Sequence, residues 1–208
     1  MIRLAIAKGR ISSEAETLLA QAGLEFPSFD DTRKLIISDK SGLYEVLLVK
    51  PADTAVYVET GVADCGIVGR DVIEETDPDV FRLFSMPFAQ CKMCVAGKEG
   101  FEYKAAKKIV AASKYVRCAE RHFKQKQIPC NVIMLNGSVE IAPLLDMSDV
   151  IVDIVQTGKT LKENGLVVLE EVFDIAPVFI TNKAALKTKQ KELYELIDIL
   201  EKQAGISQ

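Results

Sequence analysis

Short apolar runs that alternate with helix-like segments restrict the fold of this chain more than any other feature of its sequence. Residues 2–7 (IRLAIA), 63–69 (ADCGIVG) and 150–155 (VIVDIV) are typical of buried strands. Segments with helical character, such as residues 115–126 (YVRCAERHFKQK), lie between runs of this kind. This alternation predicts an α/β fold with largely parallel sheets.

The same patterns give the other expected elements. One helix begins with a capping box formed by Ser13 and Glu16 and ends at Gly23. A hairpin is expected around residues 39–42 (DKSG), followed by a short helix that ends at Gly61. Further strands are expected at 91–97, 107–113 and 131–136 and near 167–173 and 177–182, and further helices at 139–147 and about 184–203.

Length and charge exclude several classes of protein. The chain has 208 residues, 49% of them hydrophobic, which suits one large or two small globular domains. Its formal net charge is −4 and its Lys and Arg residues are not clustered, which argues against a nucleic-acid-binding surface. The amino terminus lacks the features of a signal sequence, and no apolar run approaches the roughly 20 residues of a membrane span. We therefore expect a cytoplasmic protein that binds neither nucleic acid nor membranes.

The cysteines and the histidine give no sign of a metal or redox centre. Cys91 and Cys94 have the spacing of such a pair, but no second pair or nearby histidine completes a zinc site, and the segment is strand-like. An odd set of thiols in mostly apolar segments fits reduced core residues of a cytosolic protein. We predict no metal-ligating residues, and a surface position for the sole histidine, His122, on its polar helix.

Three predicted strands end in glycine or small polar residues that also carry charge. These ends are Lys8-Gly9-Arg10, Gly69-Arg70-Asp71 and the segment from Thr157 to Leu161. In open α/β sheets, ligands bind at this edge, where loop amides and helix amino termini meet. The first end could equally be a solvated turn, whereas the second is better explained as a helix start with an acid near the positive end of the helix dipole.

The third strand end, from Thr157 to Leu161, is the one whose side chains point most clearly to ligand binding. Thr157-Gly158-Lys159-Thr160 resembles part of a nucleotide-binding P-loop, but Asp153 stands where that motif requires glycine, so the motif fails. A short loop with free backbone N–H groups, two hydroxyls and a lysine is still suited to one phosphate. Asp153, inside an apolar strand, is either a paired buried acid or a group that binds hydroxyls.

Together these segments identify a family. The chain resembles the short form of the ATP phosphoribosyltransferase of histidine biosynthesis over nearly its whole length. The segments AIAKGRI, RKLI and YVETGVADCGIVGRDV match motifs of that family in order and spacing. The most specific match is LNGSVEIAPLLDMSDVIVDIVQTGKTLKENGL at residues 135–166.

The resemblance implies a two-lobed fold of the periplasmic-binding-protein type (type II) with a central cleft. Lobe I would be discontinuous, comprising residues 1–88 and 178–208, and lobe II would comprise residues 89–177 and carry the phosphoribosyl pyrophosphate loop. The implied reaction joins N1 of the adenine of ATP to C1 of 5-phosphoribosyl 1-pyrophosphate. It gives N1-(5-phosphoribosyl)-ATP and pyrophosphate, with Mg²⁺ accompanying the substrate phosphates.

The resemblance also implies roles for individual residues. Asp153 and Glu140 would face the ribose hydroxyls, since a carboxylate accepts two charge-assisted hydrogen bonds from vicinal hydroxyls. The 5-phosphate would be held by five consecutive residues: Thr157, Gly158, Lys159, Thr160 and Leu161. ATP and the pyrophosphate group would be bound by Lys8, Gly9, Arg10, Arg33 and Lys50, with Arg10 and Arg33 as the catalytic pair.

Two departures from the family pattern concern these positions. Lys50 stands where an arginine is common, and a lysine lacks the bidentate geometry of arginine. The segment ASKY at residues 112–115 replaces a commoner threonine-containing version.

The short form further implies a partner. Its members are catalytic subunits that assemble with a regulatory subunit resembling histidyl-tRNA synthetase, usually as a hetero-octamer, and a homodimer of this chain is expected within it. Because the sequence stops at Gln208, soon after the last expected helix, we expect this chain to lack the histidine-binding domain of long forms. The main alternative is a non-catalytic two-lobed module that binds a small molecule, because fold does not fix function. A phosphoribosyltransferase acting on another base is a third possibility.

Overall fold

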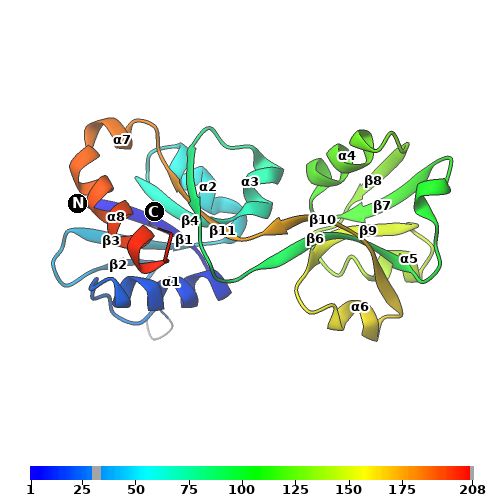
Figure 1. The fold of residues 1–208 in the computed structure, drawn as a ribbon, viewed down its shortest axis with the longest axis horizontal. Helices are drawn as coiled ribbons and strands as arrows, with labels where there is room; N and C mark the ends of the chain where they lie inside the picture. Colours follow the sequence, from blue (N-terminus) through cyan, green and yellow to red (C-terminus); the bar gives the residue numbers. More distant parts are fainter. Residues whose placement is uncertain (30–33, 207–208) are drawn as a thin grey trace. The chain divides into compact units, whose positions relative to one another are not determined.

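A computed structural model describes residues 1–29 and 34–206 of the chain, which form two compact units. Unit 1 comprises Met1–Ile73, Asp77–Ala89 and Ala176–Gln208, and unit 2 comprises Glu74–Thr76 and Gln90–Ile175. Figure 1 shows the elements of both units along the chain. No helix among the described residues is both long enough and apolar enough to cross a membrane.

Unit 1 is built on a six-stranded sheet with the order β2-β3-β1-β4-β11-β5. The strands are β1 (Ile2–Ala7), β2 (Ile36–Ser38), β3 (Tyr44–Val49), β4 (Cys65–Gly69), β5 (Phe81–Ser85) and β11 (Pro177–Thr181). The helices are α1 (Arg10–Gln21), α2 (Pro51–Glu59), α7 (Ala185–Thr188), α8 (Gln190–Gln203) and α3 (Arg70–Thr76), whose last three residues belong to unit 2. Strand β11 comes from the end of the chain and lies between β4 and β5.

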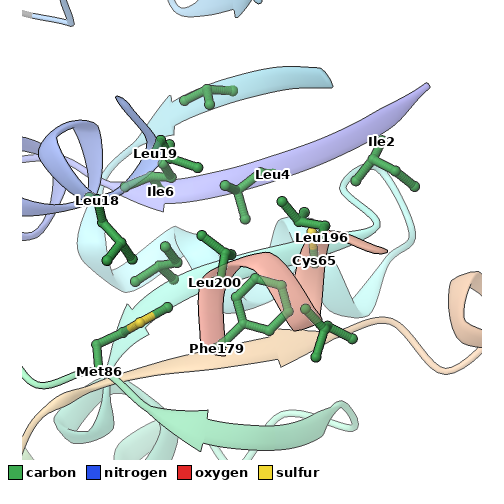
Figure 2. Close-up of a cluster of buried hydrophobic side chains, with 14 of the residues drawn as sticks. Ile2, Leu4, Ile6, Leu18, Leu19, Cys65, Met86, Phe179, Leu196 and Leu200 are labelled. Atoms are coloured by element: carbon green, nitrogen blue, oxygen red, sulfur yellow. The ribbon is translucent and has the colours of Figure 1, made fainter. Parts of the chain in front are cut away.

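Both faces of this sheet are buried. On one face, apolar side chains of β1, β4 and β11 pack against α1 and α8. Figure 2 shows this cluster, including Ile6 of β1, Leu19 of α1, Phe179 of β11 and Leu200 of α8. On the other face, a second cluster joins the sheet to α2 and α3 through residues such as Val58 and Ile73. A sheet covered on both faces explains why β1 and β4 consist almost entirely of apolar residues and glycine.

Unit 2 is built on a five-stranded sheet with the order β10-β6-β9-β7-β8. The strands are β6 (Cys91–Lys98), β7 (Ile109–Ser113), β8 (Cys130–Met134), β9 (Val150–Val155) and β10 (Leu166–Ile175). The helical segments are a 3₁₀ turn at Tyr103–Ala105, α4 (Val116–Gln125), α5 (Ile141–Leu144) and α6 (Lys159–Glu163). One apolar cluster lies between the sheet and α4, and another contains residues of α5 and α6.

Most predicted strands and helices are confirmed, but the prediction of largely parallel sheets is wrong. In unit 1, β1 runs parallel to β3 and β4, whereas β2 and β11 pair antiparallel with their neighbours. In unit 2, β7 runs parallel to β8 and β9, whereas β6 pairs antiparallel with β9 and β10. The hairpin at β2-β3 and the late return of β11 produce the antiparallel pairs of unit 1.

Several predicted helix boundaries also need correction. Helix α1 begins at Arg10, and the serine that caps its start is Ser12, not Ser13: the Ser12 hydroxyl accepts a hydrogen bond from the Gly9 N–H and donates one to the Gly9 carbonyl. Glu16 instead accepts a hydrogen bond from the Phe29 N–H, at 3.2 Å. The predicted helix at 184–203 is divided into α7 and α8 at Lys189, whose ammonium group pairs with Asp64 at 2.8 Å. Strand β5, at an edge of its sheet, was not predicted, and α5 is shorter than predicted.

The predicted surface position of His122 is wrong, because its side chain is buried. Helix α4 turns Cys118, His122 and Phe123 toward the sheet, and the spacing of four residues from Cys118 to His122 places both on one helical face. The His122 ring lies edge-on to Phe123, with 5.2 Å between the ring centres. Burial lowers the pKa of His122, which favours the neutral imidazole.

Close packing at Gly66 of β4 predicts a loss of stability when a side chain is added there. A Cβ atom at this position would lie 2.8 Å from Val58 Cγ2 and 2.9 Å from the Ala5 carbonyl oxygen. Gly66→Ala is expected to lower the free energy of unfolding by about 1–3 kcal/mol, because backbone atoms of β1 cannot yield without disturbing the sheet. Thermal unfolding followed by circular dichroism measures this change.

Gly137→Ala is the matched control, because a Cβ atom there would meet nothing within 4 Å. It is expected to leave the unfolding midpoint nearly unchanged. Equal midpoints for wild type and Gly66→Ala would show that the packing around β4 is looser than described.

Candidate functional site at the end of strand β9

A pocket in unit 2 brings together the residues of the predicted phosphate loop and both predicted carboxylates. Its volume is about 310 Å³. The pocket is lined by Glu140, Asp153, Ile154, Val155, Gln156, Thr157, Gly158, Lys159, Thr160 and Leu161. All of these residues come from the end of β9, the following loop, the start of α6 and the residue before α5. The pocket is therefore complete within one unit.

An offset between neighbouring strands opens one side of β9 at this point. The parallel ladder between β7 and β9 ends at the pair Ser113 and Val152. On the other side, the ladder between β6 and β9 continues to the pair Lys92 and Val155. The segment Asp153–Val155 is thus supported by β6 and extends beyond β7. This overhang provides the pocket wall that carries Asp153.

The loop after β9 turns sharply at Gly158. This residue has φ 70° and ψ 5°, a left-handed conformation that glycine adopts without a steric penalty. The Lys159 N–H lies 3.4 Å from Thr157 Oγ1, which accepts its hydrogen bond. The first N–H groups of a helix lack partners within the helix, so the turn into α6 leaves donors for an anion. The loop is therefore suited to a phosphate group.

The side chains of the loop divide between solvent and core. Thr157, Lys159 and Thr160 are exposed and available to a ligand. The Lys159 ammonium group lies 3.8 Å from Glu163, an exposed i,i+4 pair that constrains it weakly. Leu161 is buried among residues of β9, β10 and α5, so it can contribute only its backbone to binding. Its side chain fixes the start of α6 to the sheet.

Glu140 and Asp153 are both half-buried and line the same pocket. Glu140 precedes α5, and Asp153 lies on the overhang of β9. Carboxylates at this depth remain acceptors for hydroxyl groups of a ligand. The pocket combines donors for an anion with acceptors for hydroxyls, which suits a phosphorylated sugar.

Four of the five predicted basic-site residues lie in unit 1, at the ends of two adjacent strands. Strands β1 and β3 run parallel and end together at the pair Ala7 and Val49. Lys8 and Lys50 follow them directly, and the Lys8 N–H donates to the Val49 carbonyl at 2.9 Å. This register brings Lys8, Gly9 and Lys50 to one edge of the sheet.

Arg10 begins α1 beside this edge and is exposed. Its guanidinium group donates a hydrogen bond to the Ala89 carbonyl at 2.6 Å, which holds the side chain near the sheet edge. The fifth residue of the predicted set, Arg33, lies outside the residues that the structure describes.

The sequence analysis missed Gln156, Ile154 and Val155 as pocket residues. Gln156 is exposed between Asp153 and Thr157, and its position between two predicted ligand residues was the available signal. Ile154 and Val155 are apolar, so the sequence gives no chemical sign that they line a pocket.

A second cavity of about 230 Å³ lies at the opposite end of β9. Its lining residues are Lys98, Phe101, Asp146, Ser148 and Asp149. The Lys98 ammonium group pairs with Asp146 at 2.7 Å, and Asp149 accepts a hydrogen bond from the Val110 N–H at 2.7 Å. Lys98, Asp146 and Asp149 of this cavity thus have partners within the protein.

The described residues contain no group of three or more His, Cys, Asp or Glu side chains that could hold a metal ion. The five cysteines are free thiols, and Cys91 and Cys94 lie on β6. Burial raises the pKa of Cys94 to about 11, with Glu171 adding to the effect. A thiol with such a pKa is protonated at neutral pH and is a poor nucleophile.

Comparison with known proteins gives consistent matches. The family model described as HisG: ATP phosphoribosyltransferase matches residues 50–202. An ATP phosphoribosyltransferase of Bacillus cereus (strain AH187) is 40% identical over 203 residues, which cover 97% of this chain and 96% of the relative. A relative from Bacillus anthracis has the same identity and coverage.

Solved structures agree with the sequence matches. The ATP phosphoribosyl transferase (HisG:HisZ) complex from Thermotoga maritima contains a chain with a TM-score of 0.85 and 32% identity, with full coverage of both chains. The periplasmic aliphatic sulphonate-binding protein SsuA from Escherichia coli has a TM-score of 0.62 at 11% identity and covers 99% of this chain and 72% of its own. The predicted two-lobed fold of the periplasmic-binding-protein type is thereby confirmed.

The raised pKa of Cys94 predicts slow alkylation. At pH 8, about one Cys94 side chain in a thousand would be a thiolate, compared with a substantial fraction of free cysteine. The rate of reaction with iodoacetamide, measured by peptide mass spectrometry, is expected to be more than about tenfold below that of free cysteine and to rise with pH up to about pH 11. Rapid labelling of Cys94 at pH 7 would restore the redox interpretation of the Cys91–Cys94 pair.

Proposed function

Because the chain belongs to the ATP phosphoribosyltransferase family, which catalyses the first step of histidine biosynthesis, we propose that the pocket at the end of β9 binds the ribosyl donor of that reaction. The observation that carries this proposal is the convergence of Glu140, Asp153 and the loop from Thr157 to Leu161 on one pocket. The reaction joins N1 of the adenine of ATP to C1 of 5-phosphoribosyl 1-pyrophosphate and releases pyrophosphate.

The loop would hold the 5-phosphate of the donor. The turn at Gly158 exposes backbone N–H groups, and Thr157, Lys159 and Thr160 add hydroxyls and a positive charge. Leu161 contributes its backbone and anchors the loop through its buried side chain. A single phosphate is sufficient to occupy these donors.

Glu140 and Asp153 would bind the ribose 2- and 3-hydroxyls. Each carboxylate oxygen accepts a hydrogen bond from a hydroxyl, and such charge-assisted bonds are stronger than bonds between neutral groups. Both carboxylates lie in the same pocket as the loop, so the ring and its phosphate can be held together. This arrangement would fix the position of C1, the carbon that is attacked.

The triphosphate of ATP and the pyrophosphate leaving group would be bound by the basic edge of unit 1. The register of β1 and β3, which brings Lys8, Gly9 and Lys50 to that edge beside Arg10, supports this assignment. Arg33 completes the proposed set and, with Arg10, forms the proposed catalytic pair. In this proposal, lobe I (residues 1–88 and 178–208) supplies the basic groups, and lobe II (residues 89–177) holds the ribosyl donor.

The chemistry requires charge stabilisation more than proton transfer. Adenine N1 carries its own lone pair, so the attack needs no base, and the buried His122 need not take part. The barrier lies in the departure of pyrophosphate from a ribose that develops oxocarbenium character. Arginines placed at the leaving group would stabilise the charge that develops on it.

Mg²⁺ fits this site as a companion of the substrate phosphates. The described residues offer no preformed cage of ligands, and Mg²⁺ is commonly bound through one or two carboxylates together with phosphate oxygens and water. Glu140 and Asp153 line the same pocket as the proposed phosphate loop and could take that part. When bound, the ion would neutralise charge on the pyrophosphate.

The matched structure from Thermotoga maritima is a complex of HisG with HisZ. We propose that this chain likewise assembles with a regulatory subunit resembling histidyl-tRNA synthetase, in a hetero-octamer that contains homodimers of this chain. A cytoplasmic location is part of the proposal, since ATP is an intracellular substrate and the five cysteines are free thiols.

Turnover of the purified chain tests the proposed activity. ATP, phosphoribosyl pyrophosphate and Mg²⁺ are expected to give phosphoribosyl-ATP, followed by chromatography, with and without the regulatory subunit. Arg10→Ala and Arg33→Ala are each expected to lower kcat by about a hundredfold, because each removes a preorganised charge from the leaving group.

Arg82→Ala is the control for these variants, since Arg82 is an exposed residue of β5 that pairs with Asp77 at 3.6 Å. It is expected to leave turnover unchanged. Normal turnover by Arg33→Ala would remove that residue from the catalytic pair. No product with or without the regulatory subunit would favour the alternative, a two-lobed module that binds a small molecule without catalysis.

Inhibition by histidine is expected to require the regulatory subunit. The proposed active site is built for phosphates and ribose, so histidine is expected to act through the regulatory subunit. Dose–response curves for histidine would be measured for the chain alone and for the reconstituted complex. Equal sensitivity of the two preparations would contradict this prediction.

A further inference from the structure

Ser113 lies at the carboxyl end of β7 and is fully buried, with 0% of its surface exposed. Its hydroxyl donates a hydrogen bond to the Val152 carbonyl of β9 at 2.6 Å. The same oxygen accepts a hydrogen bond from the Tyr115 N–H at 2.8 Å. One small side chain therefore serves two buried backbone groups on two different segments.

These bonds occur where regular strand pairing stops. Ser113 and Val152 form the last pair of the β7-β9 ladder, and the chain then turns toward α4, which begins at Val116. No β7 residue beyond Ser113 belongs to this ladder. The Ser113 hydroxyl bonds to the Val152 carbonyl at this end of the ladder and also holds the Tyr115 amide in the turn.

The residue after Val152 is Asp153, the first residue of the β9 overhang. We propose that Ser113 is a positioning residue, which fixes the start of the overhang and so holds the Asp153 carboxylate at the ribose of the donor. This inference rests on the proposed function, in which Asp153 binds ribose hydroxyls. It assigns a role to Ser113 in the chain's ASKY segment.

Threonine can replace serine in this role, because it carries the same hydroxyl. Alanine cannot, because it would remove the hydrogen bonds that the Val152 carbonyl and the Tyr115 N–H make with the Ser113 hydroxyl in a buried place. Displacement of a binding group by a fraction of an ångström is sufficient to weaken substrate binding and turnover. In this proposal Asp153 binds the ribosyl donor and not ATP. The loss of affinity should therefore affect phosphoribosyl pyrophosphate and not ATP.

Ser148 offers a matched control in the same unit. It is also a buried serine, it precedes the amino end of β9, and its hydroxyl has no hydrogen-bond partner among the described residues. Ser148→Ala thus removes a buried hydroxyl near β9 without leaving a backbone group unpaired.

The test compares Ser113→Ala, Ser113→Thr and Ser148→Ala in the complex with the regulatory subunit. Ser113→Ala is expected to raise KM for phosphoribosyl pyrophosphate about tenfold, with KM for ATP changed less than about twofold. Ser113→Thr and Ser148→Ala are expected to stay within about twofold of wild type for both substrates. Calorimetric titration with phosphoribosyl pyrophosphate should show the same weakening in Ser113→Ala, independently of turnover.

A double-mutant cycle with Asp153→Asn shows whether Ser113 acts through Asp153. If it does, Ser113→Ala adds little to the effect of Asp153→Asn on binding of the donor. Equal changes in both KM values, or a lower unfolding temperature with unchanged KM values, would reduce Ser113 to a structural residue and overturn the proposal. If the wild-type complex itself showed no turnover, the proposed function would be refuted instead.

Discussion

The offset between β7 and β9 is the constraint on which the candidate site depends. Strand β9 is paired on both sides up to Val152 and only with β6 from Asp153 to Val155. A strand paired on both sides would bury Asp153 against a neighbour, where an acid is costly unless it is paired. Support on one side keeps the strand extended and leaves room for a ligand on the other. The pocket, the acid and the loop all follow from this termination of β7.

The site divides its tasks between rigid and adaptable parts. Asp153 lies on a strand, and Leu161 anchors the loop in the core. The exposed side chains of Thr157, Lys159 and Thr160 are free to adjust to a phosphate group. The lining of the pocket offers carboxylates, hydroxyls and a lysine, but neither histidine nor cysteine. This is consistent with a reaction driven by placement of charges rather than by a tuned acid or base.

Local sequence patterns predicted most of the fold, and their failures have identifiable physical causes. Strands β1 and β4 of unit 1 and the hairpin at β2-β3 were predictable from apolar runs and turn residues, whereas the edge strand β5 was not. The antiparallel pairing of β11 was not, because it joins segments more than a hundred residues apart and leaves no local trace. His122 was misjudged because its helix is polar in composition, whereas its burial depends on the helical face. In the site, Asp153 and the loop were predictable from chemistry and resemblance, but Gln156 and the support from Ser113 depend on register and contacts.

Strand β11 lies inside the sheet of unit 1, between β4 and β5, although it is made after all of unit 2. During synthesis, β4 and β5 therefore emerge with a missing strand between them, and α8 is not yet present to cover the apolar face of β1. Residues 90–175 need no later part of the chain for their own sheet. Unit 2 can thus fold on the ribosome before unit 1, so that the amino-terminal half of the polypeptide is completed last. The nascent chain has exposed strand edges during that interval, a period in which chaperones protect such segments from aggregation.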